Sequence, residues 1–147
     1  MEKLELVREN LMSALTKLSE SLRYFENLKS IVNEQASILM SNEELKKSLR
    51  DSLIQRFEFC ADLFWKYLKK YEEIILGLSL DVNAPRPVIV AACKSKIVSE
   101  IDAEILLELM RSRNFTSHIY KEEMADHIST KIPIYYKTMK KYVELLK

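Results

Sequence analysis

Apolar residues recur every three or four positions along the N-terminal part of the chain, and this period constrains the fold more than any other feature. The stripe consists of Leu4, Val7, Leu11, Leu15, Leu18, Leu22, Phe25, Leu28 and Val32. The spacing predicts one long amphipathic helix. It also fits a heptad seam, so the stripe can face a helix of the same chain or of a second copy.

A second long helix is predicted from about Ser41 to Leu76. Its start has the pattern of a capping box, with Ser41 as the N-cap and Glu44 three residues later. Gly77, the only glycine in the chain, stands where a left-handed C-cap is expected. We expect these two long N-terminal helices to pack as antiparallel neighbours.

The next part of the chain predicts two shorter helices. The third helix begins with Pro85 and runs to about Ile97, because proline suits the first turn of a helix. Ser99 or Asp102 is the N-cap of the fourth helix, which we expect to end near Arg113.

The fifth helix is predicted from about Lys121 to the C-terminus, with a kink at Pro133. Five helices and no strand predict an all-α, up-and-down bundle, and we expect residues 1–147 to form a single domain. The composition agrees with this fold class. One glycine and three prolines are too few for a loop-rich β fold, and 48% hydrophobic residues exclude a disordered chain.

The sequence predicts a cytoplasmic protein that does not enter a membrane. Cys60 and Cys93 lie far apart in apolar segments, which is typical of reduced core thiols. The first residues do not resemble a signal peptide. The longest apolar run, residues 88–93, is much too short to span a bilayer.

The overall charge does not by itself indicate a nucleic-acid-binding protein. Lys and Arg number 23 against 22 Asp and Glu, a net charge of +1, so RNA binding requires a local basic cluster. Two lysine clusters lie on predicted helix faces: Lys66, Lys69 and Lys70, and Lys137, Lys140 and Lys141. Such clusters are usually solvated faces, and they can also follow a phosphate backbone.

Most catalytic and metal-binding motifs are missing from the sequence. It has no glycine-rich phosphate loop, no Cys-x-x-Cys and no His-Glu-x-x-His. His127, one of the two histidines, lies among charged residues of a predicted helix and is interpreted as a surface residue. The acidic pairs at 43–44, 72–73 and 122–123 are interpreted as structural, so no metal site is expected.

The segment from Arg113 to Tyr120 is the one that can carry chemistry. The imidazole of His118 can donate or accept a proton near neutral pH. The guanidinium of Arg113 is always charged and matches the oxygens of a phosphate. Together they suffice to cleave RNA without a metal, because one group moves protons while the other stabilises the anionic transition state.

The spacing of these two residues sets a geometric condition. On one continuous helix, Arg113 and His118 lie about 140° apart around the axis. They converge only if the helix ends between them or if two copies of the chain share one site. Asn114, Thr116 and Ser117 favour a helix break. In a structural alternative, Arg113 complements the dipole of the fourth helix and His118 caps the fifth.

Two blocks of the sequence resemble a known family. Arg113-x4-His118-x-Tyr120 resembles the R-x4-H-x-Y motif of HEPN-domain toxins encoded beside a minimal nucleotidyltransferase antitoxin. Residues 53–68 resemble the Ile-Gln-Arg-Phe-Glu-Phe…Trp-Lys stretch of the nucleotidyltransferase substrate-binding branch. The chain departs from the family pattern at Lys121, where Asp is common, and at residues 105–107, where Trp is common.

The resemblance implies a HEPN bundle whose homodimer brings two motifs into one cleft. Arg113 and His118 would be the catalytic pair of a metal-independent endoribonuclease, with Asn114 as a supporting polar residue. Tyr120 would accept AMP from ATP in a reaction catalysed by the partner nucleotidyltransferase, which would silence the toxin. ATP and Mg²⁺ belong to that partner, and the chain itself would need no cofactor.

Two other interpretations stay open. In one, the chain is a non-catalytic adaptor that binds the nucleotidyltransferase and presents a substrate or Tyr120, and the near-neutral charge favours this slightly. In the other, it is a helical dimerisation module without a ligand. Arg56 and Glu58 of the second block receive no chemical role, and we consider a buried, structural ion pair between them.

Overall fold

The structure, a computed structural model, describes residues 2–27, 42–118 and 122–147, with side chains for residues 3–27, 43–115 and 122–147. Within these ranges the chain forms five helices and no strand, which confirms the predicted all-α class. The helices are α1 (Glu2–Asn27), α3 (Asn42–Ile74), α4 (Pro85–Lys94), α5 (Glu100–His118) and α6 (Glu122–Leu145).

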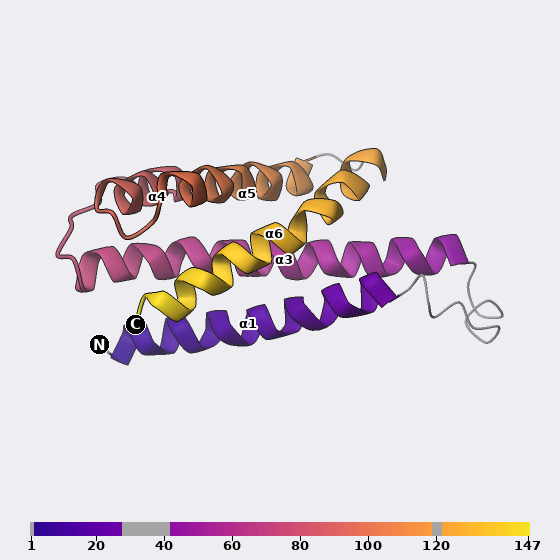
Figure 1. Cartoon of the computed structure of the whole chain (residues 1–147), viewed down its shortest axis with the longest axis horizontal. Coiled ribbons are helices and arrows are strands. Elements are labelled where there is room, and N and C mark those ends of the chain that lie inside the picture. Colours follow the sequence, from indigo (N-terminus) through magenta and orange to yellow (C-terminus); the bar gives the residue numbers. More distant parts are fainter. Residues whose placement is uncertain (1, 28–41, 119–121) are drawn as a thin grey trace.

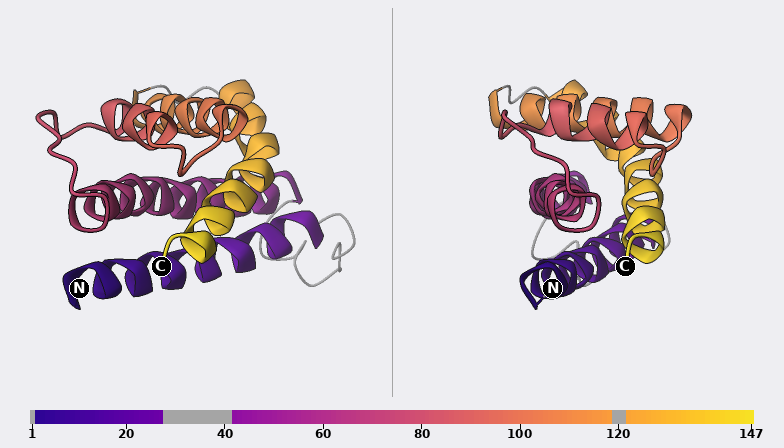
Figure 2. Two further views of the ribbon diagram at one scale, coloured as in Figure 1. Left: turned by 60° about the vertical axis from the view of Figure 1, so that its left-hand side comes forward. Right: turned by 90° about the vertical axis from the view of Figure 1, so that its left-hand side faces the viewer.

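The helices are arranged around α3. As predicted, α1 and α3 lie side by side and antiparallel (Figure 1). The helices α4 and α5 form a layer on the other side of α3 (Figure 2). From that layer α6 runs obliquely down to α1, so that it contacts α1, α3 and α5 and covers one side of the bundle.

The apolar stripe of the first helix packs inside its own chain. Leu11, Leu15 and Leu18 of α1 are buried in one core with Phe57 and Phe64 of α3. Burying such side chains stabilises a fold by about 1.5–3 kcal/mol each. The intrachain alternative for this stripe is therefore the correct one, and its last two positions, 28 and 32, lie outside the described residues.

Several predicted helix ends are confirmed. Gly77 follows α3 with φ 66°, the left-handed conformation that favours glycine. Pro85 begins α4 directly after the extended Ala84. Of the two candidate caps of α5, Ser99 is the cap, because its Oγ accepts a hydrogen bond from the backbone N of Asp102 at 3.1 Å.

Other helix ends differ from the prediction or lie beyond what is described. The helix α4 ends at Lys94 rather than near Ile97. There Lys96 adopts φ 62° and its backbone N donates to the carbonyl of Cys93, which turns the chain out of the helix. As predicted, Pro133 lies inside α6, which continues through it to Leu145, and the kink at Pro133 stays a prediction. The capping residue Ser41 is not among the described residues.

Each of the described helices is too short or too polar to serve as a membrane-spanning segment.

Candidate functional site

The helix that carries Arg113 does not end there. It continues through Asn114 to His118, so the predicted helix break between the two motif residues is wrong. Asn, Thr and Ser each disfavour a helix by less than about 1 kcal/mol. The contacts of Ser112 and Arg113 with neighbouring helices outweigh that preference. Positions 113 and 118 therefore lie about 140° apart around one helix axis.

The structure places only part of the predicted catalytic segment. Arg113 is half-buried and Asn114 is exposed, both on α5. The side chain of His118 and the whole of Tyr120 lie outside the described residues. The predicted proton carrier and the predicted AMP acceptor therefore stay predictions.

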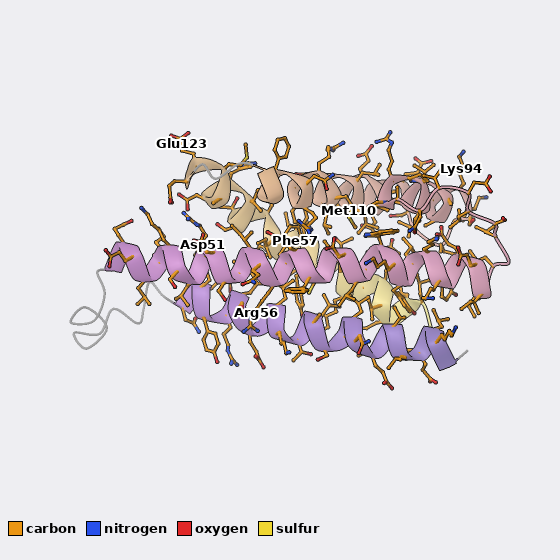
Figure 3. The ribbon with its side chains drawn as sticks, turned by 180° about the vertical axis from the view of Figure 1, so that it is seen from behind. Asp51, Arg56, Phe57, Lys94, Met110 and Glu123 are labelled. Atoms are coloured by element: carbon orange, nitrogen blue, oxygen red, sulfur yellow. The ribbon has the colours of Figure 1, made fainter. Side chains whose placement is uncertain are left out.

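Arg113 is held by two carboxylates of α3. Its Nε donates to Oδ1 of Asp62 at 3.2 Å, and its Nη2 donates to Oδ2 of the same carboxylate at 3.1 Å. Its Nη1 lies 3.4 Å from Oε2 of Glu58. Glu58 and Asp62 are four residues apart on α3, so they present neighbouring carboxylates to α5. Figure 3 shows Phe57 and Met110 in the same interface between α3 and α5.

This arrangement changes the electrostatics of the motif arginine. The hydrogen bonds to Asp62 raise the pKa of Arg113 against the opposing effect of its burial, and the charge of Glu58 adds to the rise. One cation between two carboxylates leaves a local charge of −1. A phosphate approaching Arg113 therefore meets a guanidinium that is already paired with carboxylates, in surroundings whose net charge repels it.

The contact also joins the two sequence blocks that resemble the family, because Glu58 and Asp62 belong to residues 53–68. The buried ion pair that we considered between Arg56 and Glu58 is not formed, because each side chain has a different partner. Arg56 and Glu58 are two positions apart, which separates them by about 200° around the helix axis. Their side chains therefore leave α3 on different sides. Glu58 faces α5, whereas Nη1 of Arg56 donates to the backbone carbonyl of Lys17 on α1 at 3.2 Å.

A polar cluster around the hydroxyl of Tyr135 lies one residue away from Arg113 along α5. The hydroxyl of Tyr135 on α6 donates to Oε1 of Glu108 at 3.1 Å and lies 3.0 Å from Oγ of Ser112. Burial raises the pKa of Tyr135, and its ring stacks on Phe57 with centroids 5.5 Å apart. Tyr135 thus fixes α6 against the turn of α5 that comes just before Arg113.

A buried arginine that the sequence reasoning missed lies near the start of α6. Arg50 is 3% exposed, and its Nη1 donates to Glu122 at 2.6 Å and to Asp126 at 3.0 Å. Its Nη2 also donates to Asp51. Burial alone would lower the pKa of Arg50, but these hydrogen bonds outweigh burial and raise it. The cluster fixes the first turn of α6, directly after the undescribed residues 119–121.

A buried carboxyl was also missed. Glu72 on α3 is fully buried, and neither of its carboxyl oxygens has a hydrogen-bond partner in the part of the chain that the structure describes. Burial and the neighbouring charge of Glu73 raise its pKa to about 8. Glu72 stands at the next position of the apolar stripe that contains Trp65 and Leu68. In the same way, Arg50 stands at the stripe position just before Leu53 and Phe57. A charged residue at a position of an apolar stripe was the sequence signal that could have identified Glu72 and Arg50 as buried.

The remaining candidates behave as structural residues. Cys60 and Cys93 are free thiols, and burial raises the pKa of Cys60 to about 12, which keeps it unreactive. His127 is exposed, as predicted. In the lysine clusters, Lys69 contacts Asn83 and Glu73, and Lys141 donates to Asp102 at 2.7 Å. These lysines are therefore partly neutralised.

The fold and the contact between the two blocks define an all-α protein of the bundle class. The chain belongs to the nucleotidyltransferase substrate-binding protein-like family, whose model matches residues 8–147. This family implies association with a nucleotidyltransferase. It confirms the resemblance to the substrate-binding branch, whereas the ribonuclease toxin stays a prediction.

One solved structure supports the fold. A crystal structure of a protein from Thermus thermophilus is similar, with a TM-score of 0.67 and 25% sequence identity. The match covers 88% of this chain and 98% of that chain. No curated protein sequence matches the chain.

Proposed function

We propose that this protein is a non-catalytic adaptor subunit that binds a minimal nucleotidyltransferase and presents a substrate to it. The observation that carries the proposal is the contact of Arg113 with Asp62 and Glu58. This contact uses the motif arginine to join α3 to α5. An arginine held by two carboxylates of its own chain is better placed to join helices than to stabilise a transition state. Stabilisation of a transition state needs a cation that points at the developing negative charge.

In this proposal Tyr120 is the residue presented to the nucleotidyltransferase. The partner transfers AMP from ATP to the phenol oxygen of Tyr120, which loses its proton, and pyrophosphate is released. ATP and Mg²⁺ belong to the partner. The free thiols of Cys60 and Cys93 support a reducing, cytoplasmic location for the complex.

The test is co-expression with a small nucleotidyltransferase encoded beside this chain, followed by co-purification and intact-mass measurement with ATP and Mg²⁺. We expect a stable complex and the gain of one AMP, which Tyr120→Phe abolishes. Tyr24→Phe is the matched control, because Tyr24 is 53% exposed and lies on α1. Failure to form a complex contradicts the proposal.

A second candidate is the metal-independent endoribonuclease toxin, acting on RNA as a homodimer with Arg113 and His118 as the catalytic pair and Asn114 in support. The observation that favours it is exposed apolar surface on α5. Ile101 is 74% and Phe115 is 45% exposed, and a second copy could cover both. Since α5 is continuous, such a site must combine residues of two chains.

RNA cleavage in EDTA separates the two candidates. The adaptor proposal predicts no cleavage above a buffer blank. Cleavage by the wild type that disappears in both Arg113→Lys and His118→Ala would overturn the adaptor proposal in favour of the ribonuclease. The lysine variant keeps a cation beside Asp62, so its loss of activity cannot be ascribed to an uncompensated carboxylate.

A further inference from the structure

An open groove of about 460 Å³ lies between α1 and α3, away from the contact of Arg113. Its floor on α1 includes Asn10, Ser13 and Lys17, which share one helix face because they are three, four or seven residues apart. The wall on α3 includes Arg56 and Phe59 of the second sequence block. Figure 3 shows Arg56 on the side of α3 that faces α1.

The antiparallel pairing of α1 and α3 orders the side chains along this groove. The hydrogen bond from Arg56 to the carbonyl of Lys17 brings the two cations to one end. With distance from these two cations, the residue numbers fall along α1 toward Asn10 and rise along α3 through Phe59. The groove thus has a cationic end, an aromatic middle and an amide at the far end.

The charge of the groove stands out from that of the chain. Lys17 and Arg56 are the charged members of its lining, and none of the described residues that line it carries a carboxylate. The whole chain has a net charge of only +1. The groove is therefore a local positive site, in contrast to the surroundings of Arg113, where two carboxylates outnumber the cation.

Phe59 adds an apolar surface that the fold itself does not use. Its side chain is 62% exposed, although it belongs to a helix whose neighbouring positions Phe57 and Cys60 are fully buried. Exposed aromatic faces bind planar rings by stacking, which is worth about 1–3 kcal/mol per nucleobase in proteins that use it. The guanidinium and ammonium groups beside it match phosphate oxygens.

We propose that this groove binds a mononucleotide, with the phosphate at Lys17 and Arg56, the base on Phe59 and the base edge near Asn10. The volume lies within the usual range for small-ligand sites, about 300–1,000 Å³. The lining spans about two helical turns, or roughly 12 Å along α3. That length suits one nucleotide. The second block thereby gains a role for Arg56.

The test uses the purified chain, residues 1–147, without a partner, so its outcome is independent of the proposed adaptor function. Binding of AMP is measured by calorimetry, and amide chemical shifts locate the site, with adenosine and inorganic phosphate as separate probes. We expect AMP to bind more tightly than either fragment and to shift the amides of residues 10–17 and 55–63. Lys17→Gln, Arg56→Gln and Phe59→Ala should each weaken binding by about tenfold.

Lys66→Gln is the matched control, because Lys66 is an exposed cation of α3 that does not line the groove. It should leave AMP binding unchanged. Phe59→Ala keeps the test meaningful even if Arg56→Gln loosens α1, since truncating an exposed side chain does not disturb the core. The proposal is overturned if millimolar AMP does not bind, or if Lys66→Gln weakens binding as much as the groove variants. It is also overturned if Phe59→Ala spares AMP binding and instead disrupts a nucleotidyltransferase complex, which would assign the groove to a protein contact.

Discussion

Arg113 of α5 and Asp62 of α3 form a two-point contact, with Nε to Oδ1 at 3.2 Å and Nη2 to Oδ2 at 3.1 Å. This paired geometry is the strongest form of an arginine–carboxylate interaction. It connects the middle helix of the bundle to the layer that carries the motif. The same contact therefore bears on both the stability of α5 and the chemistry available to Arg113.

Asp62→Asn removes the charge while keeping the size of the side chain. Since the side chain of Asp62 is 42% exposed and that of Arg113 is 22% exposed, solvent screens the pair. We expect the free energy of unfolding to fall by about 1 kcal/mol, measured by urea denaturation. Asp81→Asn, at an exposed loop position, is the control and should change little. Equal stability of Asp62→Asn and wild type would mean that the contact does not stabilise the fold.

The sequence predicted the helices well because their apolar period is long and regular. The stripe from Leu4 onward, the cap at Gly77 and the start at Pro85 are local signals, and each is confirmed in the structure. The continuation of α5 past Arg113 was not predictable in this way. It depends on Asp62, fifty-one positions away, which no local preference of Asn114 reveals.

The candidate site was only partly predictable for the same reason. Glu58 lies in a block that the sequence reasoning singled out, but which residue it pairs with depends on the packing of α3 against α5. Arg50 and Glu72 stand at positions of an apolar stripe, where a charged residue usually marks the edge of the buried face. Only packing shows that both are buried.

Arg50→Met tests the cluster at the start of α6. The substitution keeps an unbranched side chain but removes hydrogen bonds to Glu122 and Asp126, and these carboxylates can then hydrate because both are more than half exposed. We expect a loss of about 2 kcal/mol in unfolding free energy. Amide exchange should accelerate more near Ile128 than near Tyr142. Arg86→Met, at an exposed arginine, is the control, and uniform acceleration along α6 would contradict a local anchor.

Mixing two inactive variants tests whether a ribonuclease site is shared between chains. Positions 113 and 118 lie on one continuous helix, so a catalytic pair would take its arginine from one copy and its histidine from the other. Arg113→Lys and His118→Ala would each be inactive alone. Random exchange of subunits makes half of the dimers mixed. Each mixed dimer has one intact Arg113–His118 site and one inactive site, so activity should return to about a quarter of wild type.

That result would favour the ribonuclease over the adaptor. Complete absence of activity in the mixture, with an active wild type and proven subunit exchange, would rule out a site shared in this way. Subunit exchange is checked by mass spectrometry of one isotopically labelled variant.

Glu72→Gln tests whether the buried carboxyl makes the fold sensitive to pH. The pKa of Glu72 is about 8 in the folded chain, against an ordinary value of 4.5. The folded state therefore keeps a proton that the unfolded state loses, and stability falls as the pH rises between these two values. Relative to Glu72→Gln, the wild type should lose about 1.4 kcal/mol per pH unit from about pH 4.5 to 8.

Below pH 4.5 both states of the wild type are protonated, so the difference between wild type and Glu72→Gln should be independent of pH there. Above pH 8 both states are ionised and the difference should again be constant. Urea denaturation at pH 4, 6, 8 and 9 measures this profile. Glu9→Gln is the control, because Glu9 is an exposed glutamate on α1. A stability difference that does not change with pH would show that Glu72 ionises normally in the folded protein, and one that changes in favour of the wild type as the pH rises would show that folding lowers its pKa. Either result contradicts the prediction.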